Sequence, residues 1–329
     1  MDFCVDVSCN VVEKNICDQN KNEKVILVLG GGGARGSLQV GALDKLEKTK
    51  WVNLNNCRVF IGTSIGAILC LLYSCGFSSE EIYKDFLMKL KKVFYLTVFF
   101  NSKLFSFKNK SGLFGRKFLR NLLIDCLSKK GILSSSSEKE KDITFEKLFE
   151  RTGRKTTLVV CISNLTLGTS EFYSHENHPD KNVLESVLTS AAFPFLFSAT
   201  FDTTNEHVLS DGGIFNNFPI SKAFEFKHDR LIAISLDNFP VTKKKQIPNG
   251  LFKMFKYFIN SISYTERERI DKKLYKKYYQ QLPEESEKIK TFDFYSKKKL
   301  RLGYDLGHKI DFETIIENEE KKKIQNKTS

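Results

Sequence analysis

The stretch that most constrains the fold of this chain runs from Arg58 to Cys75 and reads RVFIGTSIGAILCLLYSC. A short β-branched and aromatic run leads into the turn at residues 62–66, GTSIG, and an apolar segment of helical length follows directly. This pattern predicts a strand, a sharp turn and a helix, with the hydroxyl of Ser64 exposed at the sheet edge beside the positive end of the helix dipole. Ser64 is therefore a candidate nucleophile, although the pattern also fits an ordinary strand-to-helix connection.

A second strand-and-helix unit precedes this turn. Residues 24–29 form an almost continuous apolar run that ends in four glycines, which is typical of a buried parallel strand. The next segment, from Ala34 to Leu46, places its apolar side chains on one helical face. Two successive β-α units predict an α/β fold with a mainly parallel central sheet flanked by helices. Further strands are predicted at residues 156–163, 169–174, 208–210 and 231–236, and further helices at 79–92, 145–150 and 182–192.

The glycine-rich loop between the first strand and helix fits more than one kind of anion site. Gly31, Gly33 and Gly36 match the G-x-G-x-x-G pattern of a dinucleotide-binding turn, but residues 48–63 contain no Asp or Glu to bind the ribose. A phosphate-binding P-loop is excluded because Gly36 is followed directly by Ser37, without the required lysine. What remains is a loop of backbone N–H groups at a helix start, which can stabilise the oxyanion formed when a serine attacks an ester.

A serine nucleophile needs a base, and the sequence offers two kinds. Asp211 follows a predicted strand and precedes two glycines, so that a tight turn would present its carboxylate at the same sheet edge as Ser64. Partial burial would raise its pKa and allow it to accept the serine proton directly, although Asp-Gly is also common in ordinary turns. None of the five histidines stands in a context that marks it as catalytic, but His228 or His308 would complete a conventional Ser-His-Asp esterase.

Four motifs, taken in order, resemble those of the patatin-like phospholipase family. They are GGGARG at residues 31–36, GTSIG at 62–66, SAAFPFLF at 190–197 and DGGIFNNFP at 211–219, and the resemblance covers about residues 24–237. It implies a patatin-like three-layer fold and a Ser-Asp dyad that hydrolyses acyl esters of lipids without histidine. By position, it implies Ser64 as nucleophile and Asp211 as base, Gly31, Gly32, Gly33 and Arg35 at the oxyanion hole, and Gly62, Gly66, Pro194, Gly212 and Gly213 at the substrate pocket.

Length and composition set the expected organisation. The 329 residues, 41% of them hydrophobic, can bury a sizeable core. We expect a loosely ordered segment over residues 1–22, a catalytic domain over 23–240 and a basic helical extension over 241–329. Because no uninterrupted apolar run reaches about 20 residues and the N-terminus lacks a signal-peptide pattern, we expect a cytoplasmic protein. The eight cysteines show no metal-binding spacing, and the expected chemistry needs no metal or other cofactor.

The formal net charge of +13 favours anionic partners. Residues 93–119 interleave phenylalanines with lysines, which fits docking on an anionic membrane, a cover over an acyl-chain pocket, or packed core with solvated lysines. We expect a phospholipid or other acyl-lipid substrate, peripheral contact with anionic membranes and no nucleic-acid partner. The predicted function is a lipid acyl hydrolase of the phospholipase A type. The alternatives are a Ser-His-Asp carboxylesterase or lipase, and a catalytically inactive lipid-binding module.

Overall fold

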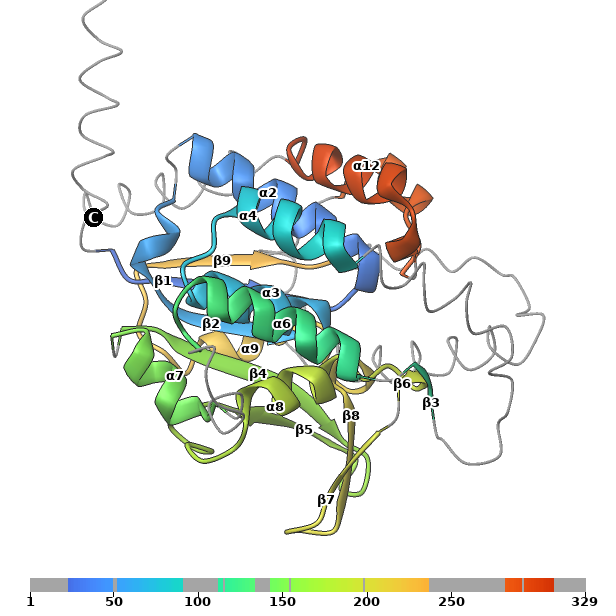
Figure 1. Ribbon diagram of the computed structural model, residues 1–329. Helices are drawn as coiled ribbons and strands as arrows, with labels where there is room; N and C mark the ends of the chain where they lie inside the picture. Colours follow the sequence, from blue (N-terminus) through green and yellow to red (C-terminus); the bar gives the residue numbers. More distant parts are fainter. Residues whose placement is uncertain are drawn as a thin grey trace, which may run out of the picture.

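The structure is a computed structural model (Figure 1) that describes residues 23–49, 52–90, 112–114, 116–133, 143–153, 155–197, 199–236, 282–291 and 293–310. The segment predicted over residues 1–22 lies outside the described residues, as do most of residues 93–119 and much of the predicted C-terminal extension. The domain boundaries at residues 22/23 and 240/241 therefore stay predictions.

A seven-stranded sheet organises the described residues, with strand order β7-β8-β4-β2-β1-β9 and β5 paired to β4. The central strands β1, β2, β4 and β9 run parallel, and β5, β7 and β8 add antiparallel pairings on the β4 side. The strand bounds are β1 Val25–Leu29, β2 Cys57–Thr63, β4 Thr157–Asn164, β5 Thr169–Tyr173, β7 Thr200–Asp202, β8 His207–Asp211 and β9 Arg230–Ile234. A separate parallel pair joins β3, Gly112–Phe114, to β6, Phe195–Phe197.

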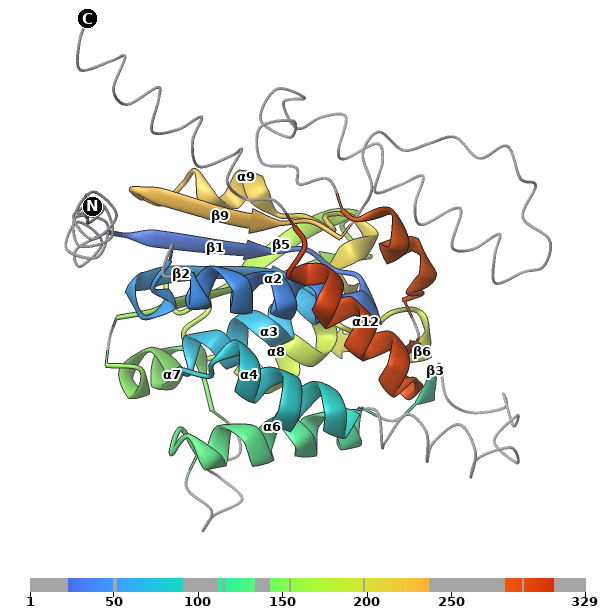
Figure 2. The same ribbon diagram turned by 90° about the horizontal axis from the view of Figure 1, so that it is seen from above.

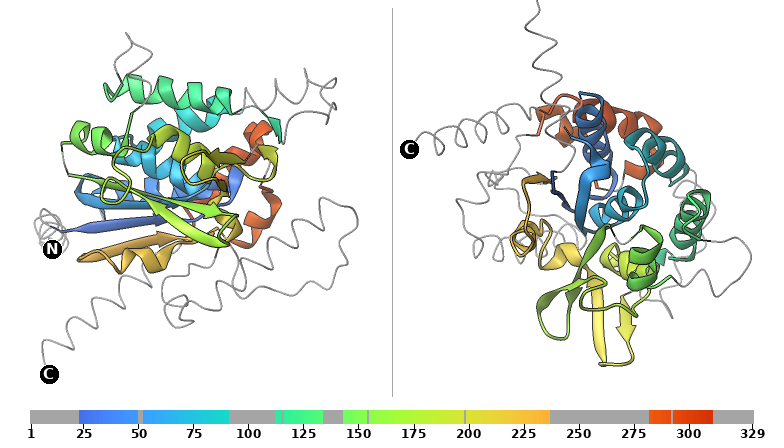
Figure 3. Two further views of the ribbon diagram at one scale, coloured as in Figure 1. Left: turned by 90° about the horizontal axis from the view of Figure 1, so that it is seen from below. Right: turned by 90° about the vertical axis from the view of Figure 1, so that its left-hand side faces the viewer.

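Most of the described helices lie on one face of this sheet, and α9 lies on the other (Figures 2 and 3). The sequence therefore forms the predicted three layers, with the sheet between helices. The sheet is mixed, because antiparallel strands are added to the predicted parallel centre. The larger helical layer contains α2 Gly36–Lys48, α3 Ile65–Ser74, α4 Ser79–Glu81, α6 Lys117–Lys129, α7 Phe145–Arg151, α8 Val183–Ser190 and α12 Lys297–Gly307, and α9 spans Ile220–Ala223. Short turns of other helix types are η2 Gly33–Arg35, η3 Leu54–Asn56, η4 Ile82–Leu87, η6 Gly212–Ile214, η7 Glu284–Lys288 and η8 Asp293–Tyr295.

Strand β1 shows why both faces of the sheet are covered. Its side chains alternate between the faces, and all five of its residues are buried. Val25, Leu27 and Leu29 join the large core beneath α2 and α3, whereas Ile26 and Val28 pack with residues of the layer that holds α9. A strand that is apolar on both faces belongs inside a layered parallel sheet, which confirms the prediction from its continuous apolar run.

Local capping explains where several helices begin. Ser78 and Glu81 form a reciprocal capping box at the start of α4, in which each side chain binds the other residue's backbone N–H. Asn182 caps α8 by accepting a hydrogen bond from the N–H of Glu185, at 2.9 Å. These caps lie within one or two residues of the predicted helix starts. None of the helices within the described ranges is long and apolar enough to span a membrane.

Candidate active site

Ser64 lies in a strained backbone conformation between β2 and α3. Its φ of 55° and ψ of −123° fall in a region that residues other than glycine rarely adopt. The flanking glycines are needed for close packing, because a Cβ on Gly66 would lie 2.2 Å from the carbonyl oxygen of Leu29, and one on Gly62 would lie 2.5 Å from the backbone nitrogen of Ala67. The turn therefore holds the half-buried Ser64 side chain at the carboxyl edge of the sheet. A role for these two glycines in a substrate pocket stays a prediction.

Strand β4 brings Ser64 and Asp211 together. One edge of β4 pairs first with β2, where Thr63 lies opposite Cys161, and then with β8, where Asp211 lies opposite Ile162. Strand β5 occupies the other edge, so β2 and β8 meet end to end along the same side of β4. Because β8 is antiparallel to β4, its carboxyl end points toward that of β2. The residues that end or directly follow these two strands are Asp211 and Ser64.

The two side chains form a hydrogen bond. The hydroxyl of Ser64 donates to Oδ2 of Asp211 at 2.8 Å, and Oδ1 of Asp211 accepts the backbone N–H of Gly213 at 2.7 Å. Asp211 is buried, and its burial raises the pKa of the carboxyl to about 7, against the lowering effect of these two hydrogen bonds. A carboxylate that titrates near neutral pH and contacts a serine hydroxyl can act as a general base.

A third residue of this site, Ser190 at the end of α8, was not predicted from the sequence. Its hydroxyl accepts the backbone N–H of Ser64 at 2.9 Å and donates to the carbonyl of Cys161 at 2.6 Å. Ser190 therefore fixes the backbone of Ser64 to strand β4. The only signal in the sequence was its position at the start of the SAAFPFLF motif.

We expect Ser190→Ala to lower kcat by about tenfold while KM changes little, because the Ser64 N–H loses its acceptor and the nucleophile shifts relative to Asp211. The cost in stability should be about 1–3 kcal/mol, since a buried donor and acceptor lose their partner. Ester hydrolysis and thermal unfolding would be measured on the same preparations. Ser186→Ala is the matched control, because Ser186 lies on the same helix and its hydroxyl, among the described residues, bonds only to the carbonyl of Asn182. Equal kinetic effects of the two substitutions would contradict a positioning role for Ser190.

The glycine loop offers fewer free donors than predicted. The N–H of Gly31 donates to the carbonyl of Asn217 at 2.9 Å, and the Asn217 side chain donates back to the carbonyl of Gly31 at 3.3 Å. Within the described residues, no group accepts the N–H of Gly32 or of Gly33. These two amides are thus available for an oxyanion, and the prediction that Gly31 is also a donor is not supported by this geometry. The N–H of Arg35 bonds to the carbonyl of Gly32 at 3.3 Å and closes the turn.

Two of the predicted pocket residues, Gly212 and Gly213, directly follow Asp211 in the chain. Gly212 and Gly213 open η6, and a Cβ on Gly212 would lie 2.3 Å from the carbonyl oxygen of Cys161. Gly212 therefore permits the close contact between η6 and β4. Pro194 lies between α8 and β6 and is partly exposed. Whether these residues contact substrate stays a prediction.

All five histidines lie within the described residues, and each contacts groups other than Ser64 and Asp211. The Nδ1 of His228 donates a hydrogen bond to the carbonyl of Phe226, and His308 lies 2.8 Å from Asp44 on α2. His175 stacks on Phe149, His178 stacks on Tyr173, and His207 bonds to Asn164. No group of three or more His, Cys, Asp or Glu side chains in the described part of the chain is placed to hold a metal ion.

The family assignment rests on this arrangement together with a match over most of the sheet. The profile of the patatin-like phospholipase family matches residues 27–224, more than half of the 329-residue chain. The chain belongs to the patatin-like phospholipase family. The match includes Ser64, Asp211 and the glycine loop, and it ends before residues 282–310. The resemblance inferred from the four motifs and the patatin-like fold are therefore confirmed.

Individual relatives of this patatin-like chain include hydrolases. Probable lipid hydrolase 463L of Invertebrate iridescent virus 6 is 34% identical over 218 residues, covering 64% of this chain and 69% of the viral protein. The cGAMP-activated phospholipase of Vibrio cholerae is 27% identical over 215 residues, covering 60% of this chain and 56% of the bacterial protein. The crystal structure of VipD from Legionella pneumophila aligns with a TM-score of 0.43 at 15% identity, covering 86% of this chain and 67% of VipD.

Proposed function

We propose that this protein is a lipid acyl hydrolase of the phospholipase A type that works through a Ser64-Asp211 dyad. The observation that carries the proposal is the 2.8 Å hydrogen bond from the Ser64 hydroxyl to the buried Asp211 carboxylate. The patatin-like family and the lipid hydrolase among the relatives support a lipid ester as the substrate. Acyl esters of phospholipids are the proposed substrate class.

In the proposed reaction, Asp211 takes the proton of the Ser64 hydroxyl while Oγ attacks the ester carbonyl carbon. The carbonyl oxygen becomes an oxyanion that accepts the free N–H groups of Gly32 and Gly33, worth about 3 kcal/mol for each well-placed donor. The C–O bond to the lysolipid then breaks, and the leaving alkoxide receives the proton from Asp211. Water, deprotonated by the same carboxylate, attacks the acyl-enzyme, and the fatty acid leaves as Ser64 recovers its proton.

The test is fatty-acid release from phosphatidylcholine vesicles that contain some anionic lipid, without added metal, by wild type and by Ser64→Ala. We expect release by wild type alone. His228 bonds to the carbonyl of Phe226 and not to Ser64 or Asp211. His228→Ala should therefore stay active and serves as the matched control. A wild type that is inert on phospholipid, neutral lipid and soluble esters would overturn the proposed hydrolase activity and leave a lipid-binding role.

We further propose that the enzyme acts in the cytoplasm and contacts anionic membranes peripherally. The net charge of +13 supports the membrane contact, as do Leu167 and Phe201, whose exposed fractions are 56% and 58%. Leu167 lies in the turn that follows β4, beyond the carboxyl edge where Ser64 lies. Most of the phenylalanine- and lysine-rich stretch lies outside the described residues.

Ser64→Ala protein should therefore sediment with vesicles that contain anionic lipid, and the bound fraction should fall as salt increases, because surface electrostatics are screened. Vesicles of neutral lipid provide the control. Equal binding to neutral and anionic vesicles, independent of salt, would contradict the electrostatic contact while leaving the hydrolase proposal intact.

A further inference from the structure

A segment near the C-terminus, outside the family match, contacts the glycine loop directly. We name residues 282–291 and 293–310 the C-terminal strap. The N–H of Ala34 donates to the carbonyl of Thr291 in the strap, at 2.8 Å. Gly33 has a φ of 60°, and a Cβ at this position would lie 2.1 Å from the same Thr291 oxygen. The Thr291 carbonyl therefore lies against the peptide unit that joins Gly33 to Ala34, next to the free amides of Gly32 and Gly33.

The Thr291 carbonyl is held in place by a closed turn within the strap. Oδ2 of Asp293 accepts the N–H of Lys290 at 2.9 Å, and the N–H of Asp293 donates to the carbonyl of Lys290 at 3.1 Å. Asp293 is 8% exposed, and its carbonyl accepts the N–H of Ser296, the residue that caps α12. Asp293 thus closes the turn that presents Thr291 through its side chain and joins this turn to the following helix through its backbone carbonyl.

Helix α12 then packs closely along α2, the helix that continues from the glycine loop. A Cβ on Gly41 would lie 2.0 Å from the carbonyl oxygen of Tyr304, and one on Gly307 would lie 2.2 Å from the carbonyl oxygen of Leu38. The two helix backbones are therefore in direct contact. Leu300 and Leu306 of α12 are buried in the main core. Because α2 and the loop are continuous, a displacement of α12 would also move the loop.

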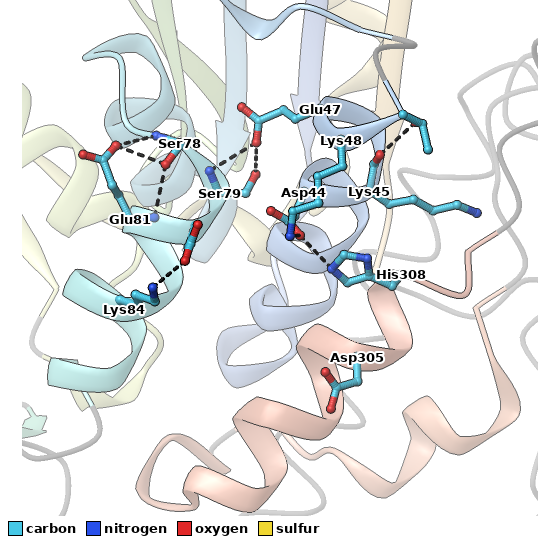
Figure 4. A network of polar contacts seen from close by, with 12 residues as sticks. Asp44, Lys45, Glu47, Lys48, Ser78, Ser79, Glu81, Lys84, Asp305 and His308 are labelled. Atoms are coloured by element: carbon cyan, nitrogen blue, oxygen red, sulfur yellow. Dashed lines mark hydrogen bonds and ion pairs between the residues drawn. The ribbon is translucent and has the colours of Figure 1, made fainter.

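Polar contacts fix the far end of the same helix pair (Figure 4). His308 reaches from the end of α12 to Asp44 on α2, with Nε2 and Oδ2 2.8 Å apart, and the Asp44 side chain is 5% exposed. The Nζ of Lys45 donates to the carbonyl of Ile310 at 3.0 Å. The strap therefore contacts the loop at the start of α2 and holds the last turns of α2 at the other end.

From these contacts we infer that the C-terminal strap positions the glycine loop, with Asp293 as the positioning residue that sets the Thr291 carbonyl. The catalytic meaning of this inference rests on the proposed function, because the amides being positioned are the proposed oxyanion donors. Because the strap binds the Ala34 N–H, the turn η2 holds the N–H groups of Gly32 and Gly33 in a fixed orientation, free of other partners among the described residues. The catalytic site thus includes a segment that lies outside the family match.

The test compares Asp293→Ala with Asp293→Asn and with Asp305→Ala. Asparagine keeps an oxygen that can accept the Lys290 N–H, whereas alanine does not. Asp305 is the matched control, because it is exposed on α12 and pairs with Arg301 of the same helix. Amide hydrogen exchange over residues 30–36 is measured in a Ser64→Ala background, where no turnover is needed, and kcat and KM are measured with Ser64 intact.

We expect Asp293→Ala to speed exchange over residues 30–36 by about fivefold or more and to lower kcat by about tenfold or more, with KM within about twofold of wild type. Asp293→Asn should recover most of both properties, and Asp305→Ala should match wild type. Unchanged exchange in a folded Asp293→Ala protein would overturn the inference, and so would faster exchange with a wild-type kcat.

Two further outcomes must be distinguished: the proposed activity can fail while the strap inference holds, and the Asp293→Ala protein can fail to fold. If wild type hydrolyses no ester, the proposed function fails, and the exchange measurement alone decides whether the strap positions the loop. If Asp293→Ala does not fold, exchange in denaturant on the Ser64→Ala protein decides it. Peptides covering residues 30–36 and 288–296 should then open with the same free energy and the same denaturant slope, and a loop that opens independently of the strap would overturn the inference.

Discussion

Ser64→Ala is expected to lower fatty-acid release by about 10⁴-fold or more, because the proposed reaction loses the hydroxyl that forms the acyl-enzyme with Asp211 as its base. The hydroxyl contributes a single hydrogen bond to the described structure, so the fold should persist. Release would be followed on mixed vesicles, with circular dichroism and thermal unfolding as checks on the fold. Activity retained above about 1% of wild type would place the nucleophile elsewhere.

Ser64→Gly adds a second readout to this prediction. It should be as inactive as Ser64→Ala, but it should be the more stable of the two, because glycine adopts the φ of 55° without the strain that serine and alanine both carry. The expected difference in the free energy of unfolding is about 1 kcal/mol, offset in part by the greater freedom of glycine in the unfolded chain. Equal or lower stability of the glycine variant would show that this backbone conformation carries little strain.

Asp211→Asn is expected to lower kcat by about 10³-fold or more while keeping the shape of the site, because an amide cannot accept the serine proton. In wild type, the rate should rise with pH and level off above about 7, since the carboxyl must be ionised to act as a base. Rates would be measured between pH 5 and 9 with a soluble ester, so that vesicle charge does not change with pH. A flat profile over this range would argue against Asp211 as the base.

The raised pKa of Asp211 also predicts that the stability of the protein changes with pH. Burial raises the pKa of Asp211 in the folded state to about 7, above the ordinary 3.8, so the folded protein favours the neutral carboxyl. The free energy of unfolding should therefore fall as the pH rises from about 4 to about 7, and this contribution should be constant above that range. Asp211→Asn lacks this titration and should be more stable than wild type at pH 8, although inactive. Urea unfolding at pH 5 and pH 8 would measure the difference, and a less stable variant at pH 8 would contradict it.

Much of the fold was predictable, because it depends on patterns that are local in the sequence. Short elements are specified by their own residues in three places. These are the apolar run before the four glycines, the turn around Ser64, and the caps at Ser78 and Asn182. The meeting of Ser64 and Asp211 was also predictable, since both were expected at strand ends on one sheet edge. The end-to-end placement of β2 and β8 on β4 was not, because strand pairing depends on tertiary register and no residue pattern within one strand encodes it.

The parts of the site that the sequence did not predict act through the backbone. The Gly31 amide is occupied because Asn217 turns its carbonyl toward it, and the Ala34 amide is held by the carbonyl of Thr291. A carbonyl oxygen is present at every residue, so no residue type marks the one that will be used. Ser190 was visible as part of a motif, but its two hydrogen bonds depend on where α8 ends relative to β4. Such contacts emerge only when separate elements are packed together.

Because β2 and β8 end against the same edge of β4, the distance between the two reacting groups does not depend on the 147 positions that separate them in the chain. The turn between β4 and β5 and the β7–β8 hairpin can lengthen or shorten while the paired backbones of β2, β4 and β8 keep Ser64 and Asp211 in register. Variation in those connections therefore need not disturb the Ser64-Asp211 pair. We expect Ser64 and Asp211 to separate only when the sheet itself unfolds.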